Sequence, residues 1–169
     1  MKLALIGYGK MGHIIEQIAR SRGHEIVKII DIDNNADIES PEFASAEVAI
    51  EFTTPHTAAD NCTRALKAGV SVVSGSTGWA DRLPEVETLA ETLGRGMLWS
   101  SNFSVGVNIC MALNRYLARV MNKFPQYMPD MTETHHVHKL DHPSRTAVTL
   151  AEGSLRETER GDGCAEGAP

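Results

Sequence analysis

At 169 residues the chain is long enough to bury a hydrophobic core, and a net charge of −6 argues against a nucleic-acid-binding surface, which needs clustered lysine and arginine. Its three cysteines are scattered and form no CxxC pair, so the sequence favours a reducing, cytoplasmic setting over a disulfide framework or a cysteine metal site. No apolar run has the length of a signal core or a membrane span. We therefore expect a small-molecule partner, with neither nucleic acid nor membrane involved.

The first 31 residues predict a strand, a glycine-rich turn, a helix and a second strand. The strands are the apolar runs at residues 3–6 and 26–31. The helix between them is amphipathic, with five apolar residues expected to face inward: Met11, Ile14, Ile15, Ile18 and Ala19. This order is that of a βαβ unit, in which the two strands are parallel.

Strand-like and helix-like segments continue to alternate as far as residue 100. Strands are predicted at residues 48–52, 70–74 and 97–100, and helices at 57–67 and 83–93. Alternation of this kind predicts an α/β fold with a parallel, doubly wound sheet. We assign residues 1–102 to this first domain.

A different pattern begins at about residue 103. A longer helix is expected at residues 105–124, a strand at 127–139 and a further helix that opens near Ser144. Residues 103–169 are therefore interpreted as a second domain, an incomplete α+β unit.

The turn after the first strand has the pattern G-x-G-x-x-G, formed by Gly7, Gly9 and Gly12. Gly7 permits a tight turn, Gly9 lets the backbone approach a pyrophosphate, and Gly12 permits close packing of the helix. The amino terminus of that helix would then face the phosphates. Glycine turns also serve structure alone, but the preceding strand and an acidic residue after the next strand predict a dinucleotide-binding Rossmann domain.

The acidic residue is Asp31, at the end of the second strand. Its carboxylate would accept a hydrogen bond from a ribose 2′-hydroxyl, which favours NADH, although an aspartate here could also only cap a turn. Lys10 lies in the glycine turn and could reach a 2′-phosphate. We therefore expect NADH to be favoured and leave NADPH open.

Two further turns follow predicted strands, at residues 51–55 and 75–78. In an open parallel sheet, ligands bind outside the carboxyl ends of the strands. Both turns therefore lie where the nicotinamide half of a dinucleotide should sit, unless they only connect elements.

Residues 133–144 crowd ionisable side chains onto the predicted strand and the segment before the last helix. In an extended chain Glu133, His135, Val137 and Lys139 share one face, which makes an acid and a cation neighbours. His136 would point the other way unless a bulge turns it back. A solvated edge strand, a metal site and hydrogen-bonded core histidines compete with a catalytic interpretation, but an acid beside a cation suits proton transfer better than metal binding.

Five motifs, in this order, together resemble the dihydrodipicolinate reductase family, the 4-hydroxy-tetrahydrodipicolinate reductases of lysine and diaminopimelate synthesis. They are G-Y-G-K-M-G at 7–12, E-F-T-T-P at 51–55, G-S-T-G at 75–78, S-N-F-S-V-G-V-N at 101–108 and H-H-V-H-K at 135–139. The resemblance covers residues 1–159. It implies NAD(P)H-dependent reduction of a cyclic dicarboxylate with loss of water, by a homotetramer whose second domain carries the subunit interface.

The resemblance also implies roles for individual residues. His135 would donate the proton, Lys139 would assist it and hold substrate, and His136 would contact substrate. The start of the last helix would bind a substrate carboxylate through Ser144, residue 145 and Thr146. The residues implied for the dinucleotide are Gly7, Gly9, Lys10, Met11, Gly12, Asp31, Phe52, Thr53, Gly75, Thr77, Ser101, Asn102 and Phe103.

The chain departs from the family pattern at two places. Arg145 stands where the family motif has glycine, and we expect its side chain to obstruct the carboxylate or to demand a disfavoured backbone conformation, unless it swings outward or pairs with the carboxylate. Family members also continue for several more strands, so we expect a truncated second domain with an open sheet edge, and poor turnover. Two alternatives stay open: another small-substrate NAD(P)-dependent dehydrogenase, and a non-catalytic dinucleotide-binding fragment.

Overall fold

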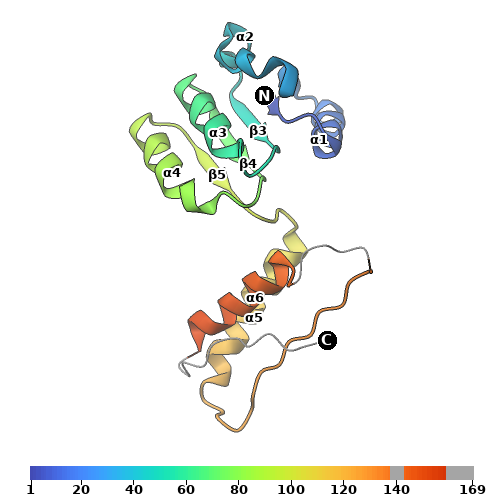
Figure 1. Ribbon diagram of the computed structural model, residues 1–169, viewed down its shortest axis with the longest axis vertical. Coiled ribbons are helices and arrows are strands. Elements are labelled where there is room, and N and C mark those ends of the chain that lie inside the picture. Colours follow the sequence, from blue (N-terminus) through green and yellow to red (C-terminus); the bar gives the residue numbers. More distant parts are fainter. Residues whose placement is uncertain (138–142, 159–169) are drawn as a thin grey trace. The chain divides into compact units, whose positions relative to one another are not determined.

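The computed structural model describes residues 1–137 and 143–158 (Figure 1). The chain divides into two compact units, Met1–Asn102 and Phe103–Pro169, and each is described by itself. None of the described helices is long and apolar enough to cross a membrane.

Unit 1 is built on a five-stranded sheet in which every pairing is parallel. The strand order is β2-β1-β3-β4-β5. The strands are β1 (Lys2–Ile6), β2 (Glu25–Ile30), β3 (Val48–Glu51), β4 (Ser71–Ser74) and β5 (Met97–Trp99). These strands confirm the five predicted at residues 3–100 and the α/β fold. Short apolar runs located them because such runs are typical of strands in parallel sheets.

Helices connect the strands. They are α1 (Lys10–Ser21), the 3₁₀ segment η1 (Ile32–Glu39), α2 (Pro41–Ala44), α3 (Ala58–Lys67), the 3₁₀ turn η2 (Ala80–Arg82) and α4 (Leu83–Thr92). Figure 1 shows α3 and α4 on one face of the sheet and α1 on the other. Sequence analysis did not predict η1, α2 or η2, because segments this short carry no clear helical periodicity. Ser40 caps α2 by accepting from the Phe43 N–H, and Phe43 is fully buried.

The order of the strands sets the position of the ligand site. The chain leaves β1 for β2 on one side and returns to β3 on the other side of β1, so the connections diverge between β1 and β3. In doubly wound sheets the crevice at this switch point, at the carboxyl ends of the strands, is where ligands bind. Gly7 follows β1 and Phe52 follows β3 at this point.

The packing of α1 differs from the prediction. Ala19 is buried, but Met11, Ile14 and Ile18 are 44%, 41% and 45% exposed. The helix packs on β1 and β2, so only the residues directly above these two strands are covered. The expectation that all five apolar residues face inward is wrong for these three.

In unit 2 the helices α5 (Val105–Met121) and α6 (Arg145–Glu157) lie side by side (Figure 1). The Asn114 side-chain amide joins them by donating to the Leu150 carbonyl at 2.8 Å and to Ser154 Oγ at 2.9 Å. The predicted helices at 105–124 and from Ser144 are confirmed. A row of α5 side chains remains exposed: Val105, Ile109, Leu113, Tyr116 and Leu117.

The strand predicted at residues 127–139 is wrong over its described part, since residues 127–137 form no strand. Regular strand structure requires backbone hydrogen bonds to a neighbouring strand. Among the described residues, unit 2 contains no other strand that could supply them.

The close approach of Gly7 to Phe52 yields a test of the fold. Gly7 has φ +94°, and an added Cβ would collide with the Phe52 carbonyl oxygen. Gly23 has φ +77° but would place a Cβ in open space. In urea unfolding we expect Gly23→Ala to lower the free energy of unfolding by about 1–2 kcal/mol, the cost of the backbone conformation alone. Gly7→Ala should lower it by about 3 kcal/mol or more, because the collision adds to that cost.

Equal losses for the two variants would show that Gly7 and the Phe52 carbonyl are not in close contact, and would contradict this arrangement of β1 and β3.

Candidate functional site: a glycine turn and a carboxylate–histidine–serine cluster

The glycine turn at the end of β1 is held by the backbone on both sides. The Gly7 N–H donates to the Ile30 carbonyl at 2.8 Å, which ties the turn to β2. An added Cβ on Gly12 would collide with the Gly7 carbonyl oxygen, so α1 can begin this close to the turn only with glycine there. Two of the three motif glycines are therefore required by the fold itself.

Gly9 is different, because none of the described residues needs its small size. Its φ is −79°, and a Cβ added there meets no atom within 4 Å. Gly9 is also the N-cap of α1, where no side chain caps the helix and the first turn holds no acidic residue. The free N–H groups of the first turn therefore lie beside a space that the described part of the chain leaves open. This arrangement fits the pyrophosphate of a dinucleotide.

Tyr8 and His13 form an aromatic pair beside the turn that sequence analysis did not identify. Their rings stack with centroids 4.0 Å apart. The Tyr8 hydroxyl donates to Glu16, which also pairs with Arg20 at 2.8 Å. These contacts lower the pKa of Glu16, with the Tyr8 hydrogen bond as the largest cause, and raise the pKa of Tyr8. The side chain at position 8 is thereby fixed along α1.

Asp31 and Lys10, which are expected to contact the ribose end of a dinucleotide, are both exposed. Asp31 is exposed directly after β2, and its backbone N–H donates to Asn34 Oδ1 at 2.7 Å. Asp31 is also the N-cap of η1. Lys10 is the exposed first residue of α1. The geometry is thus compatible with both interpretations of Asp31, as a ribose ligand and as a turn residue.

The turns after β3 and β4 are joined through a buried carboxylate, that of Glu51, which is 0% exposed. Its Oε1 accepts from the Thr53 N–H at 2.9 Å and from Ser76 Oγ at 2.8 Å, and also from the Thr53 hydroxyl. Its Oε2 accepts from the Ser74 hydroxyl. Sequence analysis gave Glu51 no role, although a glutamate that ends an apolar strand run is a signal for a buried, hydrogen-bonded acid.

Phe52 and Gly75 meet across the same two turns. A Cβ added to Gly75 would collide with the Phe52 ring, so the ring can lie on this backbone only because position 75 is glycine. The next carbonyl, that of Ser76, accepts from Trp79 Nε1 at 2.9 Å and from Trp99 Nε1 at 2.7 Å. The two indoles hold the turn in place, a role that composition and spacing did not reveal.

The remaining residues expected at the dinucleotide follow the same edge of the sheet. Thr53 and Thr77 lie in the two turns, and Met11 lies exposed in the first turn of α1. Ser101 and Asn102 come after β5, where the Asn102 N–H donates to Ser100 Oγ at 3.2 Å. All of these belong to unit 1, whereas Phe103 is the first residue of unit 2.

In unit 2 the Glu133 carboxylate gathers His135 and the start of α6. Glu133 Oε1 accepts from the Ser144 N–H at 2.7 Å, and Oε2 accepts from Ser144 Oγ at 2.6 Å. His135 Nε2 lies 2.7 Å from the same Oε2. These bonds lower the pKa of Glu133 to about 2, with Ser144 as the largest cause. Glu133 and His135 are therefore in direct contact.

The other residues expected at the substrate lie around this cluster. His136 is exposed beside His135, and Thr146 is exposed in the first turn of α6. Lys139 lies outside the described residues. Arg145 is the first residue of α6, and no described non-glycine residue has a positive φ. The expectation that Arg145 demands a disfavoured backbone conformation is therefore wrong, because the first position of a helix suits any ordinary residue.

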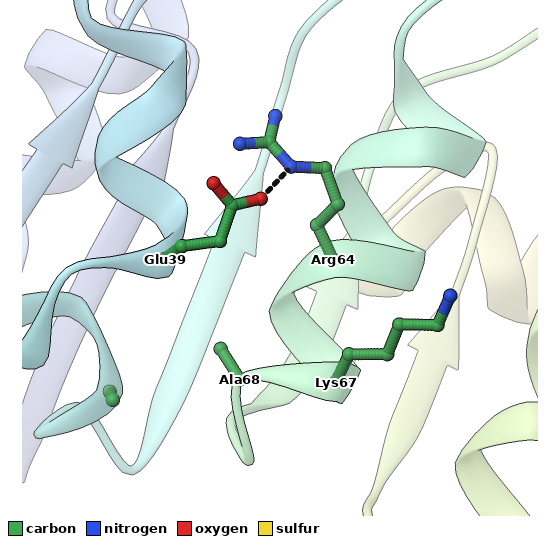
Figure 2. Close-up of a pocket in the computed structure, with 5 residues that line it drawn as sticks. Glu39, Arg64, Lys67 and Ala68 are labelled. Carbon is green, nitrogen blue, oxygen red and sulfur yellow. Dashed lines mark hydrogen bonds and ion pairs between the residues drawn. The ribbon is translucent and has the colours of Figure 1, made fainter.

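A hollow of about 290 Å³ lies elsewhere on unit 1, between α3 and the η1–α2 segment. Figure 2 shows Arg64 paired with Glu39, at 2.7 Å, and Lys67 directed away from that pair. The Arg64 hydrogen bond lowers the pKa of Glu39. The helix α3 begins after β3, at the carboxyl ends of the strands, and runs back toward their amino ends before β4. Residues 67 and 68, where α3 ends, therefore lie near the amino ends of the strands. The hollow is thus remote from the glycine turn, and its arginine is already occupied.

Among the described residues, no three histidine, cysteine, aspartate or glutamate side chains gather as a metal centre requires. The described cysteines, Cys62 and Cys110, are free thiols.

The parallel sheet, its switch point and the glycine turn define an α/β protein of the Rossmann type. Family models give the particular membership: "Dihydrodipicolinate reductase, N-terminus" matches residues 1–103, and "Dihydrodipicolinate reductase, C-terminus" matches residues 106–166. The chain belongs to the dihydrodipicolinate reductase family.

Relatives agree with this membership. The chain is 40% identical over 161 residues to the 4-hydroxy-tetrahydrodipicolinate reductase of Christiangramia forsetii, covering 95% of the chain and 66% of the relative. It is 34% identical over 170 residues to the enzyme of that name from Archaeoglobus fulgidus, covering 90% of the chain and 64% of the relative. The chain thus spans a little under two thirds of these relatives.

One solved structure matches the whole chain in fold. It is a dipicolinate-bound dihydrodipicolinate reductase from Paenisporosarcina sp. TG-14, with a TM-score of 0.74 and 24% sequence identity. The match covers 100% of this chain and 69% of that one.

The Glu133 cluster predicts how acid affects stability. In the folded chain the pKa of Glu133 is about 2, below the ordinary glutamate value of about 4.3. The Glu133 bonds therefore make their full contribution to stability when the pH is above about 4.3. Their contribution is lost as the pH falls from there through about 2. We expect the difference in melting temperature between the native chain and Glu133→Gln, followed by circular dichroism, to shrink across this window. A difference that is the same at pH 6 and pH 2 would contradict the cluster.

Proposed function

We propose that this chain carries out the cofactor-binding and proton-donating steps of 4-hydroxy-tetrahydrodipicolinate reduction. In this reaction NAD(P)H gives a hydride to the cyclic dicarboxylate, which also takes up a proton and loses water to yield tetrahydrodipicolinate. The observation that carries the proposal is Gly9, whose missing side chain leaves open space at the amino terminus of α1. The names of the relatives supply the substrate class.

In this proposal the dinucleotide supplies the hydride. Unit 1 binds the dinucleotide at its pyrophosphate, its nicotinamide and one ribose. The free N–H groups of α1, next to Gly9, bind the pyrophosphate. Phe52, Gly75 and Thr77 border the nicotinamide, because they follow β3 and β4 at the carboxyl edge. Asp31 accepts from the ribose and makes NADH the preferred form, while Lys10 leaves binding of NADPH open.

His135 is the proposed proton donor in unit 2. A histidine can hold and release a proton near neutral pH, and the Glu133 carboxylate 2.7 Å away fixes its ring. A solved relative was obtained with dipicolinate bound, which supports a dicarboxylate ligand for this chain. We assign one substrate carboxylate to the start of α6, near Ser144 and Thr146, with His136 and Lys139 as further contacts.

We include self-association and a cytoplasmic setting in the proposal. The exposed apolar row on α5 is the kind of surface that another polypeptide covers, and the family resemblance supplies a second copy of the chain as that partner. Sedimentation equilibrium tests this directly, since a monomer at all concentrations would contradict it. The free thiols of Cys62 and Cys110 agree with a reducing compartment.

Dinucleotide titration and turnover test the proposal with matched glycine variants. Gly9→Ala places a methyl group where the pyrophosphate is assigned, and we expect it to weaken NADH binding by about tenfold or more. Gly96→Ala makes the same change just before β5, at the opposite edge, and should leave binding unchanged. NADPH should bind the native chain more weakly than NADH, and much tighter NADPH binding would contradict the role of Asp31.

Turnover of fresh substrate separates this function from its rivals. The native chain should oxidise NADH slowly with the cyclic dicarboxylate, and Arg145→Gly should accelerate the reaction if the arginine obstructs the carboxylate. Dinucleotide binding without turnover in both forms would favour a non-catalytic binding protein. Turnover of other small substrates alone would favour a different dehydrogenase.

A further inference from the structure

The Glu51 carboxylate is a buried acid that the proposed reaction does not use. It is 0% exposed, and its hydrogen-bond partners are all neutral donors: the Thr53 N–H and the hydroxyls of Thr53, Ser74 and Ser76. Both carboxylate oxygens act only as acceptors in these four bonds, which is the pattern that a carboxylate offers. The bonds hold this acidic group in place at the end of β3.

Cys62 is a neighbouring thiol that is fully buried. Burial is the main cause that raises the pKa of Cys62, and the negative charge of Glu51 raises it further. In a region of low dielectric a charge acts over longer distances than it does in water.

The position of the carboxylate is as informative as its charge. Glu51 is the last residue of β3 and bonds to both turns that border the carboxyl edge, at Thr53 and at Ser76. Thr53 N–H donates in addition to Ser76 Oγ at 2.8 Å, which closes the two turns into one unit. Groups that bind between these turns lie within the field of a fixed negative charge.

We propose that Glu51 is a positioning residue that joins the two nicotinamide-bordering turns, and that its charge stabilises the oxidised nicotinamide relative to the reduced one. The inference rests on the proposed function. When a hydride, a proton with two electrons, leaves the reduced ring for the substrate, the ring becomes a cation. A fixed negative charge nearby favours that cation, and so makes the bound cofactor a stronger hydride donor.

The ratio of two dissociation constants, for NAD⁺ and for NADH, tests the charge separately from the geometry. Glu51→Gln keeps the size of the side chain and removes the charge. Its amide oxygen can take the place of Oε1, which accepts from the Thr53 N–H, and its NH₂ group can donate to the Ser74 hydroxyl once that hydroxyl rotates. We expect NAD⁺ binding to weaken about five- to tenfold more than NADH binding.

Two variants that retain the charge are the matched controls. Glu51→Asp shortens the side chain, and Ser76→Ala removes one bond to the turn, so both should weaken the two cofactor forms by the same factor. Glu51→Ala is a second neutral variant for use if Glu51→Gln does not fold, with the same change in ratio expected. Thermal unfolding checks that each variant is folded.

Equal weakening of NAD⁺ and NADH in the neutral variants would overturn the inference and leave Glu51 a structural residue, while the proposed function would stand. A native chain that binds neither cofactor form would overturn both.

Discussion

The close approach of β1 and β3 is the constraint on which the rest of unit 1 depends. Gly7 can turn beneath the Phe52 carbonyl only because it lacks a side chain and takes a positive φ. That turn starts α1 with its free N–H groups at the carboxyl edge of the sheet, beside the open space at Gly9. One steric requirement therefore places the anion-binding end of a helix at the switch point, where parallel sheets bind ligands.

Buried polar groups hold the second half of this edge together. Glu51 bonds to the turns after β3 and β4, and the indoles of Trp79 and Trp99 hold the Ser76 carbonyl from the other side. Each of these groups has a partner, as the low dielectric of a protein interior requires. In unit 2 the exposed Glu133 carboxylate accepts from the N–H of the buried Ser144 at the start of α6.

The sequence was sufficient to predict the local features of the fold. Apolar runs located the five strands, and helical spacing located α5 and α6, because these signals act over a few residues. Features that depend on distant parts of the chain were missed: the exposure of Met11 and Ile18 on α1, and the network of Glu51. The strand expected at 127–139 is also absent from its described part, residues 127–137, since a strand exists only with a partner to pair with.

Backbone hydrogen exchange with and without NADH tests whether the carboxyl edge of the sheet in unit 1 is a dinucleotide site. We expect slower exchange in NADH for the first N–H groups of α1 at residues 10–12 and for the turns at 53–54 and 75–77. Exchange near Arg64 and Lys67, beside the hollow at the opposite edge, should not change. Protection confined to that hollow, or absent from the glycine turn, would show that this edge does not bind the dinucleotide.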